Sequence, residues 1–519
     1  MFQKYRVFFL IMVLYSSLSS TAQNQYDAVW MMGANGRHLG SIEDRDLLYN
    51  NMFFDFSRDT IKFQDFRTTP IGGRASIGEM MISIASTDGE LNYYGNGSYL
   101  QSAIDTQIMK GGDSLHADNY LIQDHPGPIG YNQHTLILPS SKKEGRFHHI
   151  FNDHSRPTEE GVHATKIYHF VVDMEANEGK GEVVIRDSIY YGDVLLMGGL
   201  TAVRHGNDRD WWIMKKRKFV PEILLFHFSD EEERILDTVI YRDSILYIDE
   251  EELRESEGQL TTSVFSPQGD QFAICDFMYG IRLFDFDRHT GQLSNSRAFD
   301  HVFDIDNFNL SQGCAFSSDG SKLYYTDQFH LFQFETDKMD LFDGLDTIAE
   351  LSELNGVGMR QMSLAPDCRI YMANGQFPSV NIIMHPNRDG KACELRPKMP
   401  IDYLSHNMCY YPNYRLGTVF PFCDSTKVLP PEWRPVSNQE RVVRETLDVR
   451  IYPNPASGVV QLEAQSPIDQ VEVLDFQGRP VGVYERTTSL DLSHQPAGLY
   501  FLRITSREGQ VTKKLILQR

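Results

Sequence analysis

The chain alternates short apolar runs with compact polar turns, and one stretch shows the unit most clearly. In residues 264–274 an apolar run ends in the turn Ser-Pro-Gln-Gly, and a second alternating run follows it. Proline fixes φ for the first turn position, and glycine provides the positive φ that comes next. Alternating apolar and polar positions on both sides of such a turn predict a tight β-hairpin.

The same hairpin pattern recurs through most of the chain. Clear copies are residues 315–325 and 363–371, so that the turn positions 269, 320 and 368 are 51 and 48 residues apart. A β-rich repeat of this length is typical of propeller blades, each of which is a four-stranded antiparallel sheet. The pattern predicts an all-β fold with a seven-bladed β-propeller, WD-repeat or YVTN-like, over residues 26–423. Looser copies occupy residues 86–94, 143–150 and 206–213.

The seventh blade is expected to come from the two ends of this region. Residues 29–33 and 52–56 are strand candidates before the first hairpin, and residues 401–423 follow the last one. Pairing N-terminal strands with a C-terminal segment closes a ring and removes its exposed strand edges. We therefore assign these three segments to one blade.

Residues 1–22 have the pattern of a secretory signal peptide. Lys4 and Arg6 precede an apolar run over residues 7–15, and small residues up to Ala22 mark a cleavage site before Gln23. The apolar run is too short to cross a bilayer as a helix, and no later segment is long and apolar enough to do so. The sequence predicts a protein that is exported through the periplasm, with no transmembrane segment in its mature chain.

The C-terminal part of the chain differs in composition from the repeats. Residues 424–446 contain several prolines and charges with little periodicity, which predicts a linker. Residues 447–519 contain six or seven short strand candidates separated by turns. This spacing predicts a small immunoglobulin-like β-sandwich as a second domain.

Several motifs of this second domain resemble the type A C-terminal sorting domain of the Bacteroidota type IX secretion system. The resemblance implies that an outer-membrane translocon reads the domain and that the cargo is then released or attached at the cell surface. It implies no chemistry for the cargo itself. The matching residues are Tyr452, Pro453, Asn454, Pro455, Gly478, Gly498, Tyr500, Lys513 and Lys514.

The repeat region resembles a group of secreted Bacteroidota propeller proteins of unknown function. The shared elements include residues 30–33, 200–205 and 411–417, together with the Ser-Pro-x-Gly hairpins. This resemblance supports the fold, but it implies no activity that could be assigned to particular residues.

Charge and cysteine content narrow the possible partners. The chain has 71 acidic and 49 basic residues and a formal net charge of −22, which argues against nucleic-acid binding. Its six cysteines can form disulfides in an exported protein. Cys409–Cys423 and Cys368–Cys393 would close the shortest loops, although several cysteines could instead be small buried hydrophobes.

The segment with the most candidate chemistry joins two strand candidates. Arg204 and His205 are followed by two aspartates and by Trp211. If this hairpin lies at the mouth of a propeller channel, Arg204 or His205 could contact an anionic or sugar ligand, with the indole of Trp211 for stacking. Alternatively, the tryptophan packs between blades and Arg204 donates to carbonyl groups in the channel.

No other pattern reaches a catalytic or metal-binding arrangement. His148, His149, Asp153 and His154 are close in sequence, but adjacent strand residues point to opposite faces and cannot both be ligands without a bend. No nucleophile elbow, P-loop or zinc-protease motif occurs, and the sialidase Asp-box is not matched. The sequence therefore predicts no catalytic residues, metal or cofactor.

These observations leave three functional hypotheses. The first is a secreted or cell-surface propeller that binds a protein or a glycan and is exported by its C-terminal domain, more consistent with a non-enzyme. The alternative is an extracellular hydrolase or lyase with a site at the channel mouth. The third is a scaffold for surface display.

Overall fold

The computed structural model shows two compact units, residues 1–433 and residues 434–519. The predicted all-β fold is confirmed, because the described elements are strands apart from four short 3-10 turns. These turns are Asn177–Gly179, Ser244–Leu246, Leu341–Gly344 and Gly390–Cys393. The structure describes residues 25–33, 51–65, 82–95, 97, 99–113, 115, 133–158, 161–196, 198–246, 261–276, 280–300, 313–327, 329–350, 361–373, 379–400, 411, 414, 425–430, 433, 449–464, 467–474, 480–506 and 509–518.

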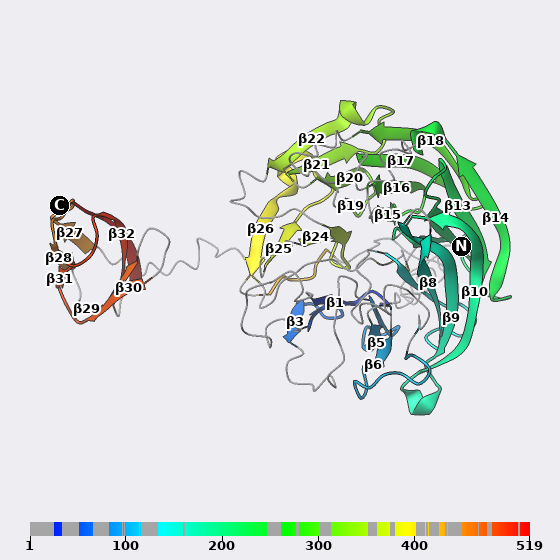
Figure 1. Cartoon of the computed structure of the whole chain (residues 1–519), viewed down its shortest axis with the longest axis horizontal. Helices are drawn as coiled ribbons and strands as arrows, with labels where there is room; N and C mark the ends of the chain where they lie inside the picture. The colour runs from blue at the N-terminus through cyan, green and yellow to red at the C-terminus, as the bar shows by residue number, and fades with distance from the viewer. Residues whose placement is uncertain are drawn as a thin grey trace, which may run out of the picture. The chain divides into compact units, whose positions relative to one another are not determined.

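The first unit consists of small antiparallel sheets arranged about a common centre like the blades of a propeller (Figure 1). Within its described residues there are five four-stranded and two three-stranded sheets. The three-stranded sheets are β1 (Val29–Gly33), β2 (Asn51–Asp55), β3 (Lys62–Asp65), and β4 (Ile82–Ala85), β5 (Leu91–Gly95), β6 (Leu100–Ser102). The four-stranded sheets are β7 (Thr135–Pro139), β8 (Phe147–Thr158), β9 (Gly161–Asp173), β10 (Glu182–Leu195); β11 (Thr201–Arg204), β12 (Trp211–Lys216), β13 (Glu222–Ser229), β14 (Arg234–Arg242); β15 (Thr261–Phe265), β16 (Gln271–Asp276), β17 (Gly280–Asp287), β18 (Gln292–Phe299); β19 (Gly313–Phe316), β20 (Lys322–Thr326), β21 (His330–Glu335), β22 (Leu345–Glu350); and β23 (Met362–Leu364), β24 (Ile370–Ala373), β25 (Ser379–Ile383), β26 (Leu395–Pro400).

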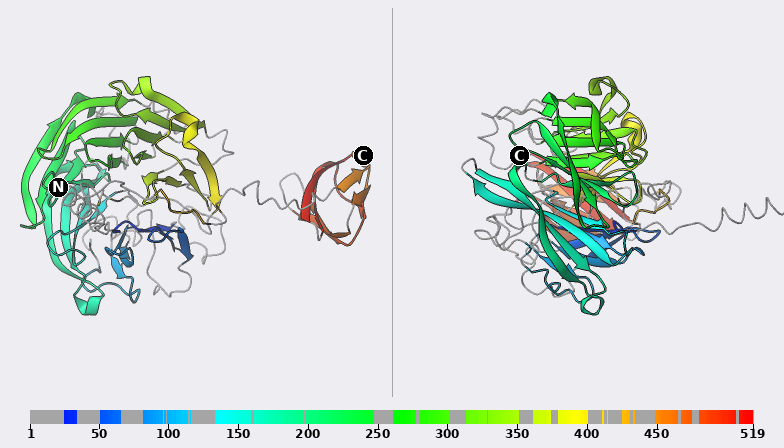
Figure 2. Two further views of the ribbon diagram at one scale, coloured as in Figure 1. Left: turned by 180° about the vertical axis from the view of Figure 1, so that it is seen from behind. Right: turned by 90° about the vertical axis from the view of Figure 1, so that its right-hand side faces the viewer.

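In each four-stranded sheet the strands follow their order in the sequence. The first strand lies toward the centre and the last lies at the rim, as β15 and β18 show in Figure 1. The strands β8, β9 and β10 have 12, 13 and 14 residues and are the longest of the described strands in this unit. Figure 2 shows them running along one side of the unit.

The predicted hairpin turns are confirmed. The turn positions Gly269, Gly320 and Cys368 have φ values of 70°, 73° and 66°. Each of their N–H groups donates to the carbonyl oxygen three residues earlier, at 2.9, 3.0 and 3.0 Å. A single residue in the left-handed region therefore reverses the chain at the same place in successive sheets.

These turns also connect neighbouring sheets. The β7–β8 turn contacts the β13–β14 turn, where Ser141 N donates to Asp230 Oδ2 at 2.6 Å. The β11–β12 turn contacts the β17–β18 turn, where Gly206 N donates to Arg288 O at 2.9 Å. The same relation recurs between Gln271, whose Nε2 donates to Thr336 O at 3.2 Å, and the next sheet. These contacts therefore join the four consecutive sheets from β7–β10 to β19–β22.

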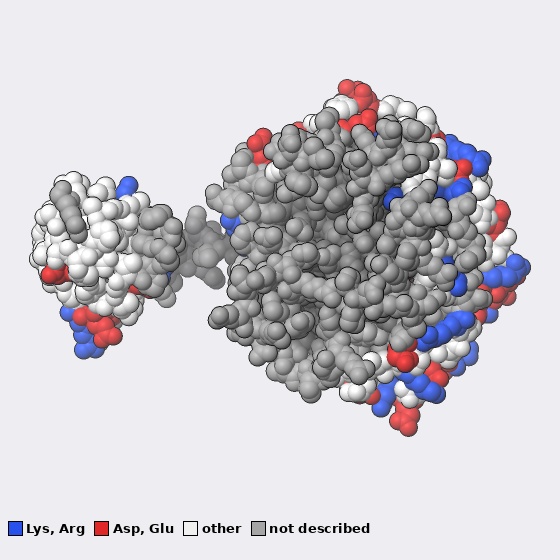
Figure 3. All heavy atoms as spheres, viewed as in Figure 1, with Lys and Arg blue, Asp and Glu red and all other residues white. Residues whose placement is uncertain are grey.

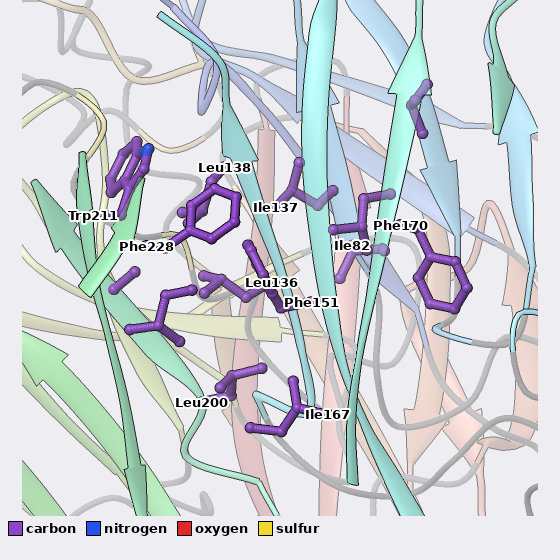
Figure 4. Packing of buried hydrophobic residues seen from close by; sticks show 14 of the residues in the cluster. Ile82, Leu136, Ile137, Leu138, Phe151, Ile167, Phe170, Leu200, Trp211 and Phe228 are labelled. Atoms are coloured by element: carbon purple, nitrogen blue, oxygen red, sulfur yellow. The ribbon is translucent and has the colours of Figure 1, made fainter. Parts of the chain in front are cut away.

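The core of the first unit lies between sheets, because each inner strand is covered on both faces. One cluster joins strands β4 to β13 and includes Trp211, Phe228, Leu138 and Phe151, which lie close together in Figure 4. Further apolar clusters fill the spaces between the later sheets. Burial on both faces explains why these strands read as nearly continuous apolar runs.

The packed part of the first unit reaches further along the chain than the boundary predicted at residue 423. Thr60 forms a parallel bridge with Val428, and the buried indole of Trp433 donates to Pro400 O at 2.9 Å. Val428 and Trp433 thus belong to the first unit, although the prolines of this stretch suggested a linker. Residues 401–410 of the predicted closing segment lie outside the described residues, whereas Tyr411 OH donates to Val29 O at 3.1 Å.

The second unit contains two antiparallel sheets that share one apolar core. Its core residues come from both sheets, for example Val460 and Leu490 from one and Val471 and Leu502 from the other. One sheet has β27 (Val449–Tyr452), β28 (Val459–Ala464) and β31 (Ser489–Asp491). The other has β29 (Ile468–Leu474), β30 (Pro480–Glu485), β32 (Gly498–Ser506) and β33 (Gly509–Leu517).

One predicted disulfide is wrong. Cys393 is a buried free thiol, as are Cys275 and Cys314, whereas Cys368 is disulfide-bonded. The prediction failed because a short loop between two cysteines does not ensure that their side chains face each other. The other expected partners, Cys409 and Cys423, lie outside the described residues, as does the predicted signal peptide.

Within the described ranges, the structure contains no helix that is both long and apolar enough to cross a bilayer.

Candidate functional site

The structure brings the three predicted ligand residues together at the β11–β12 turn. Arg204 ends β11, His205 begins the turn and Trp211 begins β12. Arg204 and Trp211 are paired across the hairpin. None of this tests whether the group binds a ligand, so that role remains a prediction.

Arg204 is half-buried and incompletely hydrogen-bonded. Its guanidinium lies over the Trp211 ring at 3.8 Å, and Nη1 donates to Arg209 O at 2.7 Å. Its other N–H groups have no partner among the described residues. Burial lowers the pKa of Arg204 to about 10, against the opposing effect of the Asp230 carboxylate, so the side chain stays cationic at neutral pH.

Three other hairpins show which kind of residue occupies the position of Arg204 elsewhere in the repeat. Phe265, Phe316 and Leu364 occupy the same place, as the last residue of the first strand, directly before the turn. Phe265 packs its ring against Phe272 with centroids 5.1 Å apart. At this position the repeat therefore carries an apolar residue, and only in the β11–β12 hairpin among these four does a cation replace it.

The Trp211 indole packs against the Arg204 guanidinium, and its ring is not accessible to a ligand. It is completely buried in the cluster shown in Figure 4. An arginine held flat on an indole gains cation–π attraction and loses conformational freedom before any ligand arrives. Within the predicted site, the role that suits Trp211 is therefore to position Arg204.

In the β11–β12 turn, the His205 ring accepts the hydrogen bond that a serine hydroxyl accepts in the β4–β5 turn. Ser86 Oγ accepts from the backbone N–H of Asp88 at 3.2 Å, and His205 Nδ1 accepts from Asn207 N at 3.0 Å. The His205 ring lies parallel to the His227 ring, with centroids 4.4 Å apart. Burial, and then the proximity of His227, lower the pKa of His205, so its ring favours the neutral form. The geometry makes His205 chiefly a turn-capping residue.

Asp210 fixes the far end of this turn. Its Oδ2 accepts from Asn207 Nδ2 at 2.8 Å and lies 3.1 Å from His227 Nε2. Its Oδ1 accepts from the backbone N–H of Asp230 at 3.2 Å. Both carboxylate oxygens are thus used within the protein, and Asp210 acts as a positioning residue for the turn.

Behind the turn, three buried titratable side chains form a chain of contacts. Asp230 Oδ1 lies 3.0 Å from His149 Nε2, and His149 Nδ1 lies 3.0 Å from His169 Nε2. Asp230 Oδ2 also accepts from Ser141 Oγ at 2.5 Å. Hydrogen bonds from His149 and the serines hold the pKa of the Asp230 carboxyl far below its ordinary value, although burial opposes this.

Sequence reasoning missed the roles of Asp230 and His227. The Asp230 carboxylate and its partner His149 are 81 residues apart, and a single aspartate after a strand is an ordinary turn residue. The histidines considered as metal ligands are dispersed: His148 and His149 point to opposite sides of β8 and contact Tyr93 and His169 respectively. In the part of the chain that the structure describes, no three His, Cys, Asp or Glu side chains are placed to hold a metal ion.

Charged side chains at the rim of the first unit are mixed in sign. In the described part of the face in Figure 3, blue and red side chains lie next to each other along the rim. On β14, Arg234 pairs with Glu232 at 2.5 Å, and Arg242 pairs with the buried Glu222. On this face, positive and negative side chains are therefore interspersed along the described rim.

In the second unit, the predicted sorting motif lies along the last strand. Asn454 Nδ2 donates to Lys514 O at 2.8 Å, and Asn454 Oδ1 accepts from Ile516 N at 2.9 Å. Tyr500 OH donates to Pro496 O at 2.9 Å, which places Gly498 inside the same turn. Tyr452, Pro453, Pro455 and Lys514 are exposed and Lys513 is half-buried, whereas Gly478 lies outside the described residues.

Solved structures that resemble the chain share little sequence with it. A protein from Lactobacillus plantarum matches with 12% identity and a TM-score of 0.40, covering 74% of this chain and 98% of that one. The Cps50 (Swd1) β-propeller domain of Myceliophteria thermophila matches with 11% identity and a TM-score of 0.34, covering 63% and 86%. Hydrazine synthase of Kuenenia stuttgartiensis matches with 13% identity and a TM-score of 0.33, covering 69% and 95%.

The comparison with curated proteins found no match to this chain. The comparison with family models found one, and it concerns the second unit. Residues 450–518 match the family described as the secretion system C-terminal sorting domain, which confirms the sorting domain predicted from the sequence.

Proposed function

We propose that the protein is a secreted or cell-surface binding module, exported by the type IX secretion system through its second unit. Its first unit binds a protein or a glycan at the turn that carries Arg204. The sorting domain supports the export step. The binding step is supported by the arrangement of sheets about one centre, which holds turns rigidly on one face, and by the side chains of the β11–β12 turn.

The binding proposal rests on one observation. Arg204 places a cation at a position where the three other hairpins compared above have an apolar residue. Arg204 rests on a buried indole and keeps N–H groups without a described protein partner. A planar guanidinium with several donors binds a carboxylate or sulfate group in two-point fashion, and it also donates to carbonyl oxygens. The ligand class we propose is therefore an acidic glycan or an acidic protein segment.

A binding screen on glycan and peptide arrays tests this proposal. The purified wild-type protein is expected to retain acidic probes, and Arg204→Ala is expected to lose at least about tenfold in affinity, as for a half-buried charge-assisted contact. Lys338→Ala, at a half-exposed lysine paired with Glu335 on the β21–β22 turn, serves as the matched control. Equal binding by wild type and Arg204→Ala would overturn the assignment of the site.

The export step can be tested separately. Deleting residues 447–519 is expected to leave the protein in the periplasm, because the translocon then has no sorting domain to recognise. The fractions are compared by immunoblot with those of the full chain. Export of the truncated protein at the normal level would contradict the role of the second unit.

The finer architecture is also part of the proposal. We infer that the sheets of the first unit are seven blades, with the last blade built from β1 to β3 and the segment that follows β26. We further infer that the second unit has an immunoglobulin-like topology and that residues 1–22 are removed before Gln23. N-terminal sequencing of the exported protein checks the cleavage site.

A further inference from the structure

A second arginine lies on the same turn as Arg204 and is more exposed. Arg204 Nη1 donates to the backbone carbonyl of Arg209 at 2.7 Å, so the two residues are held next to each other. The backbone N–H of Arg209 donates to Asn207 Oδ1 at 3.1 Å, which fixes the main chain at this point. The Arg209 side chain is 68% exposed. A fixed main chain thus presents an accessible guanidinium beside Arg204.

The Arg209 guanidinium forms a weak ion pair with Glu231 on the β13–β14 turn. Its Nη1 lies 4.0 Å from Glu231 Oε2, and the Glu231 side chain is 76% exposed. An ion pair this long between two exposed side chains contributes little to stability and is weakened by salt. The β13–β14 turn is anchored independently of this pair, because Lys142 Nζ donates to the backbone carbonyl of Glu231 at 2.6 Å. The Arg209 guanidinium can therefore leave Glu231 without moving either turn.

The contact with Glu231 shows which kind of group Arg209 accepts. Residues 230–233 of the β13–β14 turn are all acidic. The Glu231 side chain meets the β11–β12 turn through Arg209, whereas the Glu232 side chain pairs with Arg234 of its own hairpin. Arg209 thus holds a glutamate that belongs to an acidic peptide segment. A separate peptide with neighbouring carboxylates offers the same group to Arg209 and a second one to the adjacent arginine.

We propose that Arg209 is a second binding residue of the Arg204 site and that the ligand is an acidic protein segment with two neighbouring carboxylates. One carboxylate binds Arg204, and the other displaces Glu231 from Arg209. The inference rests on the binding site proposed above and names its ligand. The two contacts reinforce each other, because the first raises the local concentration of the second carboxylate. A segment with one carboxylate makes only one contact, so the site distinguishes singly from doubly charged segments.

Isothermal titration of the full-length protein with two synthetic peptides tests the number of contacts. One peptide has two adjacent glutamates between neutral residues, and in the other peptide one of these glutamates is replaced by glutamine. The wild-type protein is expected to bind the double-glutamate peptide about threefold more tightly at low ionic strength, as for one exposed charged contact. Arg209→Gln is expected to bind both peptides equally, because it keeps the backbone carbonyl that accepts from Arg204 but has no charge.

Two substitutions on the β13–β14 turn separate displacement from a general effect of charge. Glu231→Gln removes the carboxylate that competes for Arg209 and is expected to tighten binding of the double-glutamate peptide about twofold. Glu232→Gln removes the same charge from the same turn, but its partner is Arg234, so the affinity is expected to stay unchanged. Equal tightening by both variants would mean that Arg209 acts only through the overall charge, and it overturns the inference.

The outcomes separate this inference from the site on which it rests. If the wild-type protein binds both peptides equally, or Arg209→Gln still prefers the double-glutamate peptide, the role of Arg209 is overturned and the Arg204 site remains. Binding of an oligogalacturonate but of neither peptide overturns the protein ligand in favour of an acidic glycan. A wild-type protein that binds neither the peptides nor the oligogalacturonate contradicts the Arg204 site itself.

Discussion

The turns β19–β20 and β11–β12 have the same backbone but different side chains. In both, the fourth residue is left-handed, Gly320 with φ 73° and Asp208 with φ 59°. In both, its N–H donates to the carbonyl of the first residue, at 3.0 and 2.9 Å. The residue before the turn is Phe316 in one and Arg204 in the other, and the first is buried in an apolar cluster. The two turns therefore share one backbone conformation, but the residue before the turn is apolar in one and positively charged in the other.

This comparison shows where a repeat protein can hold a function. In the β19–β20 hairpin, Phe316 before the turn stabilises the sheet through apolar packing. The β11–β12 turn forms the same reversal but adds a cation, a histidine stacked on His227 and one anchored carboxylate, that of Asp210. His205 and Asp210 are used by the turn itself, so Arg204 is the side chain that this reversal does not require.

The largest expected difference between the two turns is in stability. Phe316→Ala should lower the free energy of unfolding by about 3–5 kcal/mol, because it opens a cavity in a closely packed cluster. Arg204→Ala at the equivalent place should cost only about 1 kcal/mol, as for a half-buried side chain with one hydrogen bond. Urea unfolding of both variants measures this difference, and equal losses would contradict the comparison.

The turn glycine should have the next largest effect. Gly320→Val forces a β-branched residue to a positive φ and should destabilise the protein by about 2–3 kcal/mol. A Cβ at this position would also lie 2.3 Å from Gln268 Oε1, so the Gln268 side chain must move. Thermal unfolding measures the effect, with Gly179→Ala as a contrast at a positive φ where a Cβ meets no atom within 4 Å. An unchanged melting temperature for Gly320→Val is the result that speaks against this turn geometry.

Acid should destabilise the region behind the β11–β12 turn. Burial lowers the pKa of both His148 and His169 to about 3 from the ordinary value of 6.5. The unfolded chain therefore binds these protons first, so stability is complete above about pH 6.5 and falls as the pH drops toward 3. Between pH 7 and pH 5.5 the two histidines should together cost about 2 kcal/mol. Urea unfolding at the two pH values measures this loss, and His148→Phe should reduce it by about half.

The smallest expected effect concerns Asp208, the residue of the β11–β12 turn that has a positive φ. Asp208→Gly should stabilise the protein by about 0.5 kcal/mol, because glycine adopts a positive φ without steric cost. The change also removes the exposed contact of Asp208 with Arg288, 3.4 Å long, which contributes little. Parallel melting curves of wild type and variant give the sign, and a clear loss of stability would mean that this contact matters more than the backbone.

Features that depend on neighbouring residues could be predicted from the sequence. The hairpins follow from the turn chemistry of Pro267, Gly269 and Gly320, and alternation fixes the strands around them. The sorting domain is predicted from its resemblance to a known family, whose motif residues, such as Asn454 and Lys514, occur here in the same order. These predictions needed no knowledge of which sheets become neighbours.

Features that depend on contacts between sheets could not be predicted. Nothing in the sequence near Asp230 indicates that it meets His149 from another sheet, and His205 looked like a ligand residue although it caps its own turn. The pairing of Cys368 with Cys393 failed for the same reason. Trp433 follows a proline-rich stretch that reads as a linker, yet its indole packs near Phe54 of the first unit.

The most direct test of the account is the binding of acidic array probes by Arg204→Phe. This variant restores the apolar residue that the other hairpins carry, so its stability should match the wild type within about 1 kcal/mol. We predict that it folds normally and loses the acidic probes that the wild type retains. Retention of those probes by a folded Arg204→Phe protein would show that the polar turn is not the binding site.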